Sequence, residues 1–127
     1  KAIELLGSDP DGFFLMVEGG RIDHASHDND YENTVSETLS FDTSVLEALI
    51  YASGRNDTLV IVTSDHVTGG LSIVGGYESS GTVLYEWIDD YHTGNMVPVY
   101  AYGPRSVEVI GFKDNTDIGE FLFSAIE

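Results

Sequence analysis

Residues 58–66 read Thr-Leu-Val-Ile-Val-Thr-Ser-Asp-His, an apolar run that ends abruptly in a carboxylate and an imidazole. The β-branched side chains of residues 58–63 are typical of a strand that is buried on both faces of a sheet. In open α/β proteins, ligands bind beyond the carboxyl ends of the strands. The stretch therefore predicts an α/β fold with Asp65 and His66 at the edge of the sheet where ligands bind.

The rest of the chain supports the same fold class. A second apolar run, Phe13–Val17, precedes Glu18 and predicts another strand. Between the two runs, apolar residues at helical spacing predict a helix over Tyr31–Ser53. The order of strands and helices indicates an α/β protein with a mainly parallel sheet flanked by helices. Further expected elements are a helix end at Lys1–Leu6, a short strand at Leu71–Val74, a loop at Gly75–Gly81, a strand at Met96–Tyr102, and a helix from a cap at Asp114 to Ala125.

These strands are too few to cover the edges and faces of a sheet. The chain also opens with what the pattern predicts to be the last turns of a helix, and its first residue is Lys1. We therefore expect it to be part of a larger domain, whose sheet is seen here only in part.

Composition excludes several classes of function. Twenty-two acidic residues against five basic ones give a net charge of −17. This charge argues against nucleic acid and anionic membrane surfaces as partners, since both are held by Lys and Arg. It suits a solvated surface of the kind found in halophilic proteins. No apolar run approaches the roughly 20 residues of a spanning helix. The absence of cysteine excludes disulfides and thiolate metal ligands within the chain.

Candidate metal ligands follow the predicted strands. Asp23 and His27 are four residues apart and so share one face of a helical turn, where both can ligate one zinc ion. Each signal alone has an ordinary explanation, such as a solvated strand end, a surface ion pair or a loop histidine. Their grouping favours a multi-metal hydrolase. The full set of candidates is Glu18, Asp23, His24, His27, Asp65, His66 and His92.

Four stretches resemble the alkaline phosphatase family, and together they cover nearly the whole chain. Residues 17–27 (Val-Glu-Gly-Gly-Arg-Ile-Asp-His-Ala-Ser-His) resemble its first metal-binding stretch, and residues 58–70, which end in Asp-His-Val-Thr-Gly-Gly, resemble the second. His-Thr-Gly at residues 92–94, followed by residues 97–104, resembles the third. Residues 114–119 resemble the start of the closing helix.

The resemblance implies two zinc ions and one magnesium ion. The first zinc would activate water for the second half-reaction, and the second would lower the pKa of a serine nucleophile. The resemblance places His24 near the phosphate, at a position that varies in the family, and an ordinary histidine that contacts the metal ligands explains it equally well. The implied ligands are Asp23, His27 and His92 for the first zinc, Asp65 and His66 for the second, and Glu18 for magnesium.

Other parts of the family's site have no match here. The serine nucleophile, a phosphate-binding arginine, an aspartate shared by zinc and magnesium, and further magnesium ligands lie upstream in the family. Arg21, Arg55 and Arg105 sit at unrelated positions, so no catalytic nucleophile is assigned within the chain. We expect residues 1–127 to be the C-terminal part of one alkaline-phosphatase-like domain.

The leading hypothesis is metal-dependent hydrolysis of small phosphate monoesters, with an upstream part of the same protein as partner. The resemblance also suggests a periplasmic or secreted homodimer. One alternative is a phosphodiesterase or phosphomutase of the same superfamily. Another is a non-catalytic acidic cation-binding module, which would bind many divalent ions without preferring zinc.

Overall fold

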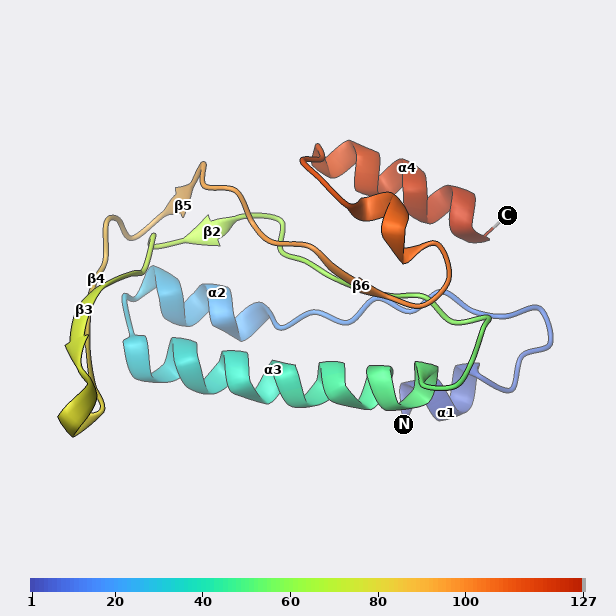
Figure 1. Ribbon diagram of the computed structural model, residues 1–127, viewed down its shortest axis with the longest axis horizontal. Coiled ribbons are helices and arrows are strands. Elements are labelled where there is room, and N and C mark those ends of the chain that lie inside the picture. The colour runs from blue at the N-terminus through green and yellow to red at the C-terminus, as the bar shows by residue number, and fades with distance from the viewer. Residues whose placement is uncertain (127) are drawn as a thin grey trace. The chain divides into compact units, whose positions relative to one another are not determined.

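A computed structural model describes residues 1–126, and Figure 1 shows the course of the chain through them. The described helices are α1 (Ala2–Leu6), α2 (Gly20–His27), α3 (Tyr31–Ala52) and α4 (Asn115–Ile126), with 3₁₀ turns η1 (Glu78–Ser80) and η2 (Ser106–Val109). The described strands are β1 (Val60–Val62), β2 (Val67–Thr68), β3 (Ser72–Tyr77), β4 (Thr82–Glu86), β5 (His92–Thr93) and β6 (Tyr100–Tyr102).

The contacts divide the chain into two compact units. The first unit comprises Lys1–Glu18, Ser44–Val62 and the residues from Val99 through α4. The second comprises Gly19–Thr43 and Thr63–Pro98. All the candidate ligands except Glu18 belong to the second unit.

In the first unit, β1 pairs with β6 in antiparallel register, with Val60 opposite Tyr102 and Val62 opposite Tyr100. Gly103 ends this ladder at a φ of +107°, and a Cβ there would collide with the carbonyl oxygen of Thr58. Glycine is therefore required for the chain to leave β6 so close to the start of β1.

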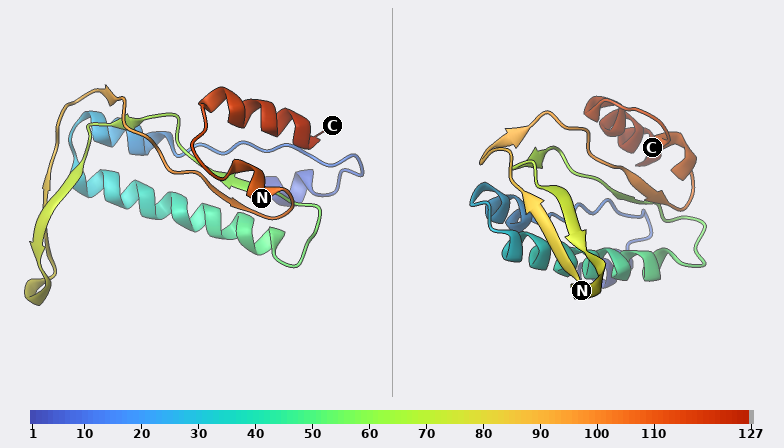
Figure 2. Two further views of the ribbon diagram at one scale, coloured as in Figure 1. Left: turned by 45° about the horizontal axis from the view of Figure 1, so that its top comes forward. Right: turned by 60° about the vertical axis from the view of Figure 1, so that its left-hand side comes forward.

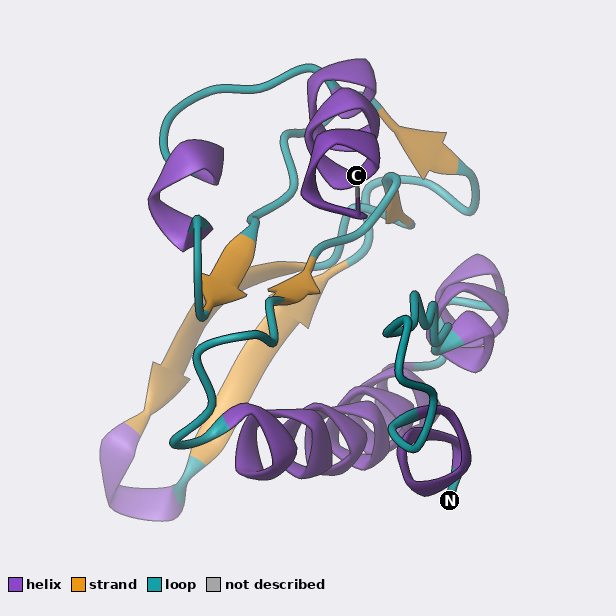
Figure 3. Ribbon diagram, turned by 90° about the vertical axis from the view of Figure 1, so that its right-hand side faces the viewer, coloured by secondary structure: helices purple, strands orange, loops and turns teal. Residues whose placement is uncertain are grey.

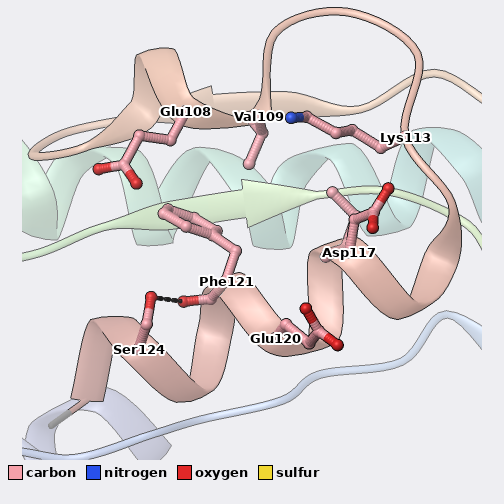
Figure 4. A pocket seen from close by; sticks show the side chains of 8 residues that line it. Glu108, Val109, Lys113, Asp117, Glu120, Phe121 and Ser124 are labelled. Carbon is pink, nitrogen blue, oxygen red and sulfur yellow. Dashed lines mark hydrogen bonds between the residues drawn. The ribbon is translucent and has the colours of Figure 1, made fainter.

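The same unit contains an open pocket between η2 and α4 (Figure 4). Arg105 joins the two elements, because its guanidinium donates to both carboxylate oxygens of Glu108 and to the carbonyl oxygen of Ser124. The carboxylates of Asp117 and Glu120 lie at the pocket together with Lys113. Since the arginine is fully engaged by its neighbours, we regard this contact as a structural tie for α4.

In the second unit, α2 and the first turns of α3 lie side by side (Figure 1). Ser26 and Thr34 are both buried, and their hydroxyls lie 3.3 Å apart. Asp30 caps α3, since its carboxylate accepts a hydrogen bond from the backbone N–H of Asn33 at 3.0 Å. This short connection holds the two helices antiparallel.

Two antiparallel strand pairs complete the second unit. β2 pairs with β5, with Val67 opposite Thr93 and Thr68 opposite His92. β3 pairs with β4 to form the long hairpin drawn in Figures 2 and 3. Gly81, at a φ of +65°, forms the turn at its tip. Most side chains of this hairpin are exposed.

The helices agree with the sequence analysis more closely than the strands do. α3 ends one residue before the expected Ser53, and α4 covers the expected terminal helix. α1 ends at Gly7, as the pattern of Lys1–Leu6 predicts. The strands β1 and β6 are shorter than the apolar runs that contain them.

The mainly parallel sheet is not observed. Every strand pair among residues 1–126 is antiparallel, and the strands form three separate two-stranded sheets. Residues 13–17 follow a drawn-out course in Figure 1 but belong to no strand of the described chain, and Met16 is 77% exposed. An apolar run predicts an extended segment, whereas a strand also needs a partner for its N–H and C=O groups.

The expected loop at Gly75–Gly81 is wrong in its first part, because β3 continues to Tyr77 and the turn comprises only residues 78–81. Gly75 and Gly76 belong to β3, opposite Leu84 and Val83 of β4, beside a register shift after Ile73. A Cβ on Gly76 would lie 2.6 Å from the carbonyl oxygen of Thr82. These glycines therefore mark an irregularity and a close backbone approach within a strand, and not a break between elements.

No helix in the described part of the chain is both long enough and apolar enough to cross a membrane.

Candidate metal centre

Helix α2 places two of the candidate ligands on one face. Its backbone enters the helix at Gly19, where a Cβ would lie 3.0 Å from the ring of Phe41. One turn of helix separates Asp23 from His27, and His27 Nε2 lies 3.4 Å from Asp23 Oδ1. The helical spacing is therefore sufficient to bring a carboxylate and an imidazole together.

The β2–β5 ladder brings a third ligand to the same point. His92 is the first residue of β5, and its Nε2 lies 3.1 Å from His27 Nε2 and 3.6 Å from Asp23 Oδ1. One donor atom from each of these three residues lies within 4.8 Å of the other two, so the group could hold a metal ion. We call Asp23, His27 and His92 the ligand triad.

The spacing of the triad fits zinc. Nitrogen and oxygen ligands about 2.0–2.1 Å from a tetrahedral zinc ion lie about 3.3 Å from one another. The three measured separations of 3.1, 3.4 and 3.6 Å bracket that value. The side chains remain 31% to 42% exposed, which leaves solvent access for a fourth ligand.

A backbone carbonyl sets the tautomer of His27. Its Nδ1 lies 2.7 Å from the carbonyl oxygen of Asp90, which can only accept a hydrogen bond. Nδ1 therefore carries a proton and donates it, and the neutral ring then has its lone pair on Nε2, the atom that faces the triad. Such outer partners orient metal-binding histidines and fix their tautomer.

The pKa of Asp23 is held below its ordinary value. The main cause is the hydrogen bond from the Thr68 hydroxyl, which donates to Oδ1 at 2.6 Å. Partial burial opposes this effect, and the nearby imidazoles of His27, His66 and His92 add to it. Asp23 is consequently an anion near neutral pH, as a metal ligand must be.

His66 lies next to the triad but outside it. Its ring stacks on that of His92, with centroids 3.6 Å apart and planes at 20°. Its Nε2 lies 3.3 Å from Oδ2 of Asp65, whose side chain is 77% exposed. Among the described residues, Asp65 and His66 thus form a neighbouring pair, while the compact ligand group consists of the triad.

The remaining two candidates are exposed. His24 follows Asp23 on α2, about 100° further around the helix. Its side chain makes no hydrogen bond or ion pair to another described residue. Glu18 ends the extended segment of the first unit. Neither side chain belongs to the ligand group within its own unit.

Two groups at this site were not assigned a role from the sequence. Thr68 contacts both Asp23 and His66, and one signal could have indicated it, because residues two apart in a strand project from the same face. The carbonyl of Asp90 had no such signal, since any residue supplies the same backbone group.

The sequence of the chain is similar to that of known proteins. The alkaline phosphatase family model matches residues 1–87. Alkaline phosphatase 3 of Bacillus subtilis is 31% identical over an alignment that covers 99% of this chain and 42% of the relative. Alkaline phosphatase H of Pseudomonas aeruginosa is 35% identical, with coverage of 93% and 28%.

Solved structures give the same result. A variant of TAB5 alkaline phosphatase, from an Antarctic bacterium, superimposes with a TM-score of 0.87 at 35% identity, covering 98% of this chain and 39% of that one. That structure has magnesium bound in a site called M3. The fold and the ligand triad describe an α/β protein with a group of side chains that could hold a metal ion, and the chain belongs to the alkaline phosphatase family. It spans less than half the length of the relatives described here.

Proposed function

We propose that this protein hydrolyses phosphate monoesters and that the chain supplies the first zinc site of the reaction. The observation that carries the proposal is the ligand triad, in which Asp23, His27 and His92 converge at separations that suit tetrahedral zinc. Three protein ligands with an open fourth position are the arrangement of a catalytic zinc, in contrast to a closed structural site.

Further metal ligands are proposed from the family resemblance. Asp65 and His66 would hold a second zinc, and their support is the contact between the His66 and His92 rings. Glu18 would bind magnesium, and His24 would lie near the phosphate. The serine nucleophile and the phosphate-binding arginine would come from an upstream part of the same protein, which we propose to be a periplasmic or secreted homodimer.

Charge explains why metal ions are needed. A phosphate monoester is a dianion, and a chain with a net charge of −17 repels it. Bound zinc and magnesium supply the positive charge that the oxygens of the transferring group require. The chain's own residues hold that charge in place. Asp23 remains ionised through its bond from Thr68, and His27 is oriented by the carbonyl of Asp90.

The test is hydrolysis of a chromogenic phosphate monoester at alkaline pH by the protein that contains this chain together with the upstream part that would supply the serine. We expect turnover that a chelator abolishes and that zinc with magnesium restores. His92→Ala should lose the activity, while Glu78→Ala, an exposed acidic change, should keep it. If both variants keep their activity, the proposal is overturned. It is also overturned if the protein hydrolyses a phosphodiester preferentially in a parallel assay.

A further inference from the structure

Thr68 occupies a buried position between the two proposed zinc sites. It is 8% exposed, ends β2 and lies directly opposite His92 in the β2–β5 ladder. The next residue, Gly69, has a φ of +72°, and a Cβ there would lie 2.5 Å from the ring of Trp87. The backbone on both sides of Thr68 is therefore tightly determined, and its β-branched side chain has little rotamer freedom.

The hydroxyl of Thr68 makes two polar contacts with residues that lie far apart in sequence. It is 2.6 Å from Oδ1 of Asp23 and 3.1 Å from Nδ1 of His66. A hydroxyl has one proton to donate and lone pairs with which to accept. An ionised carboxylate can only accept, so the Thr68 proton must point to Asp23.

The tautomer of His66 follows from this assignment. Because the proton of Thr68 is committed to Asp23, the Thr68 oxygen faces Nδ1 of His66 with a lone pair. Nδ1 must then carry the hydrogen and donate it. In the neutral ring, Nε2 keeps its lone pair, and Nε2 is the atom that lies 3.3 Å from the Asp65 carboxylate.

We propose that Thr68 is a positioning residue that orients a ligand of each zinc site through one hydroxyl. It holds the carboxylate of Asp23 in the triad and keeps Nε2 of His66 unprotonated and available to a metal. The inference rests on the proposed function and deepens it. It also explains why a polar side chain is buried at this position: its hydroxyl is fully hydrogen-bonded.

Three variants test the proposal by zinc affinity, measured in competition with a chromophoric chelator. Thr68→Val removes the hydroxyl with little change in shape and should weaken zinc binding by about 10- to 100-fold, as is usual for outer partners of metal ligands. Thr68→Ser keeps the hydroxyl and should restore most of the affinity. Thr82→Val, on the exposed β4 strand, is the matched control and should bind zinc as the wild type does.

A second measurement requires no metal, and the wild type alone can decide it. Nitrogen NMR of the metal-free protein, at a pH where imidazole is neutral, should show the His66 proton on Nδ1. In Thr68→Val this preference should disappear, and in Thr68→Ser it should remain. A proton on Nε2 of His66 in the wild type would overturn the proposal even if Thr68→Val failed to fold.

The two proposals can fail separately. If His92→Ala loses zinc while Thr68→Val binds it as tightly as the wild type, only the role of Thr68 is overturned. If His92→Ala binds zinc normally, the zinc site itself is wrong, whatever the His66 tautomer. Failure of Thr68→Ser to restore affinity would show that packing at this position matters more than the hydroxyl and would also overturn the role.

Discussion

The ligand triad and the pair Asp65–His66 look alike in sequence but differ in the structure. Both combine a carboxylate with imidazole, yet the donors of Asp23, His27 and His92 lie within 4.8 Å of one another, whereas Asp65 is 77% exposed beside His66. The triad has a helix turn and a strand ladder to position it. The pair consists of adjacent residues after an apolar run. The side chains of adjacent residues in an extended backbone project in different directions, so the sequence alone does not bring them to one point.

The difference shows that a side chain is held in place by its own immediate hydrogen-bond partners, so neighbouring candidate ligands can be positioned to different degrees. Each member of the triad has an outer partner or a place in regular structure, including the Asp90 carbonyl for His27 and the Thr68 hydroxyl for Asp23. For Asp65, the described hydrogen bond comes from the backbone N–H of His66, which donates to Oδ1 at 3.2 Å. We therefore expect the affinity for zinc to fall strongly when a residue of the triad is changed and only weakly when Asp65 is changed.

The largest effect is expected from His92→Ala. Removing one of three donors should weaken zinc binding by roughly 100-fold or more, since even outer partners contribute about 10- to 100-fold. Competition titration with a chromophoric chelator measures the change. Glu78→Ala is the control, and equal zinc affinities in the two variants would show that the triad does not bind the ion.

Zinc should also stabilise the folded chain through the triad. A ligand that binds only the folded state at about 100 times its Kd raises the free energy of unfolding by about 2.7 kcal/mol. We expect the Tm of the wild type to rise with zinc and to fall back with chelator. The Tm of His92→Ala should barely respond at the same zinc concentration, and an equal rise in both proteins would contradict the assignment.

A smaller effect concerns the acid titration of Asp23. The bond from Thr68 holds the pKa of this carboxyl below its ordinary value of 3.8, so folding gains stability from it above that pH. The gain is lost as the pH falls through the lowered pKa. Carbon NMR of the metal-free protein measures the titration directly. We expect a midpoint below 3.8 in the wild type and a higher one in Thr68→Val.

The smallest effect is expected from Asp65→Asn. Its side chain lies outside the triad, so the zinc affinity of that group should change by no more than a few-fold. Asp65→Asn should instead remove a second, weaker zinc-binding event. Calorimetric titration separates the two events. Loss of the tighter event in Asp65→Asn would mean that the triad and the pair form a single site.

Periodic patterns accounted for the helices and for two of the three members of the triad. The apolar stripe predicted α3 to within one residue, and the four-residue spacing of Asp23 and His27 predicted their shared face. Both results depend on the helical repeat, which is a property of the local backbone. The strand predicted for the apolar run at residues 13–17 is not observed among the described residues, because the pairing that makes a strand lies beyond local information.

The sequence by itself determined the set of candidate ligands, the helical segments and the acidic charge, because these depend on residue type and short-range geometry. The tertiary structure alone decided which ligands meet. His92 reaches His27 across 65 residues of chain because β5 pairs with β2, and the same ladder sets Thr68 opposite His92. Such long-range pairing comes from the hydrogen bonds of two strands that no local pattern connects.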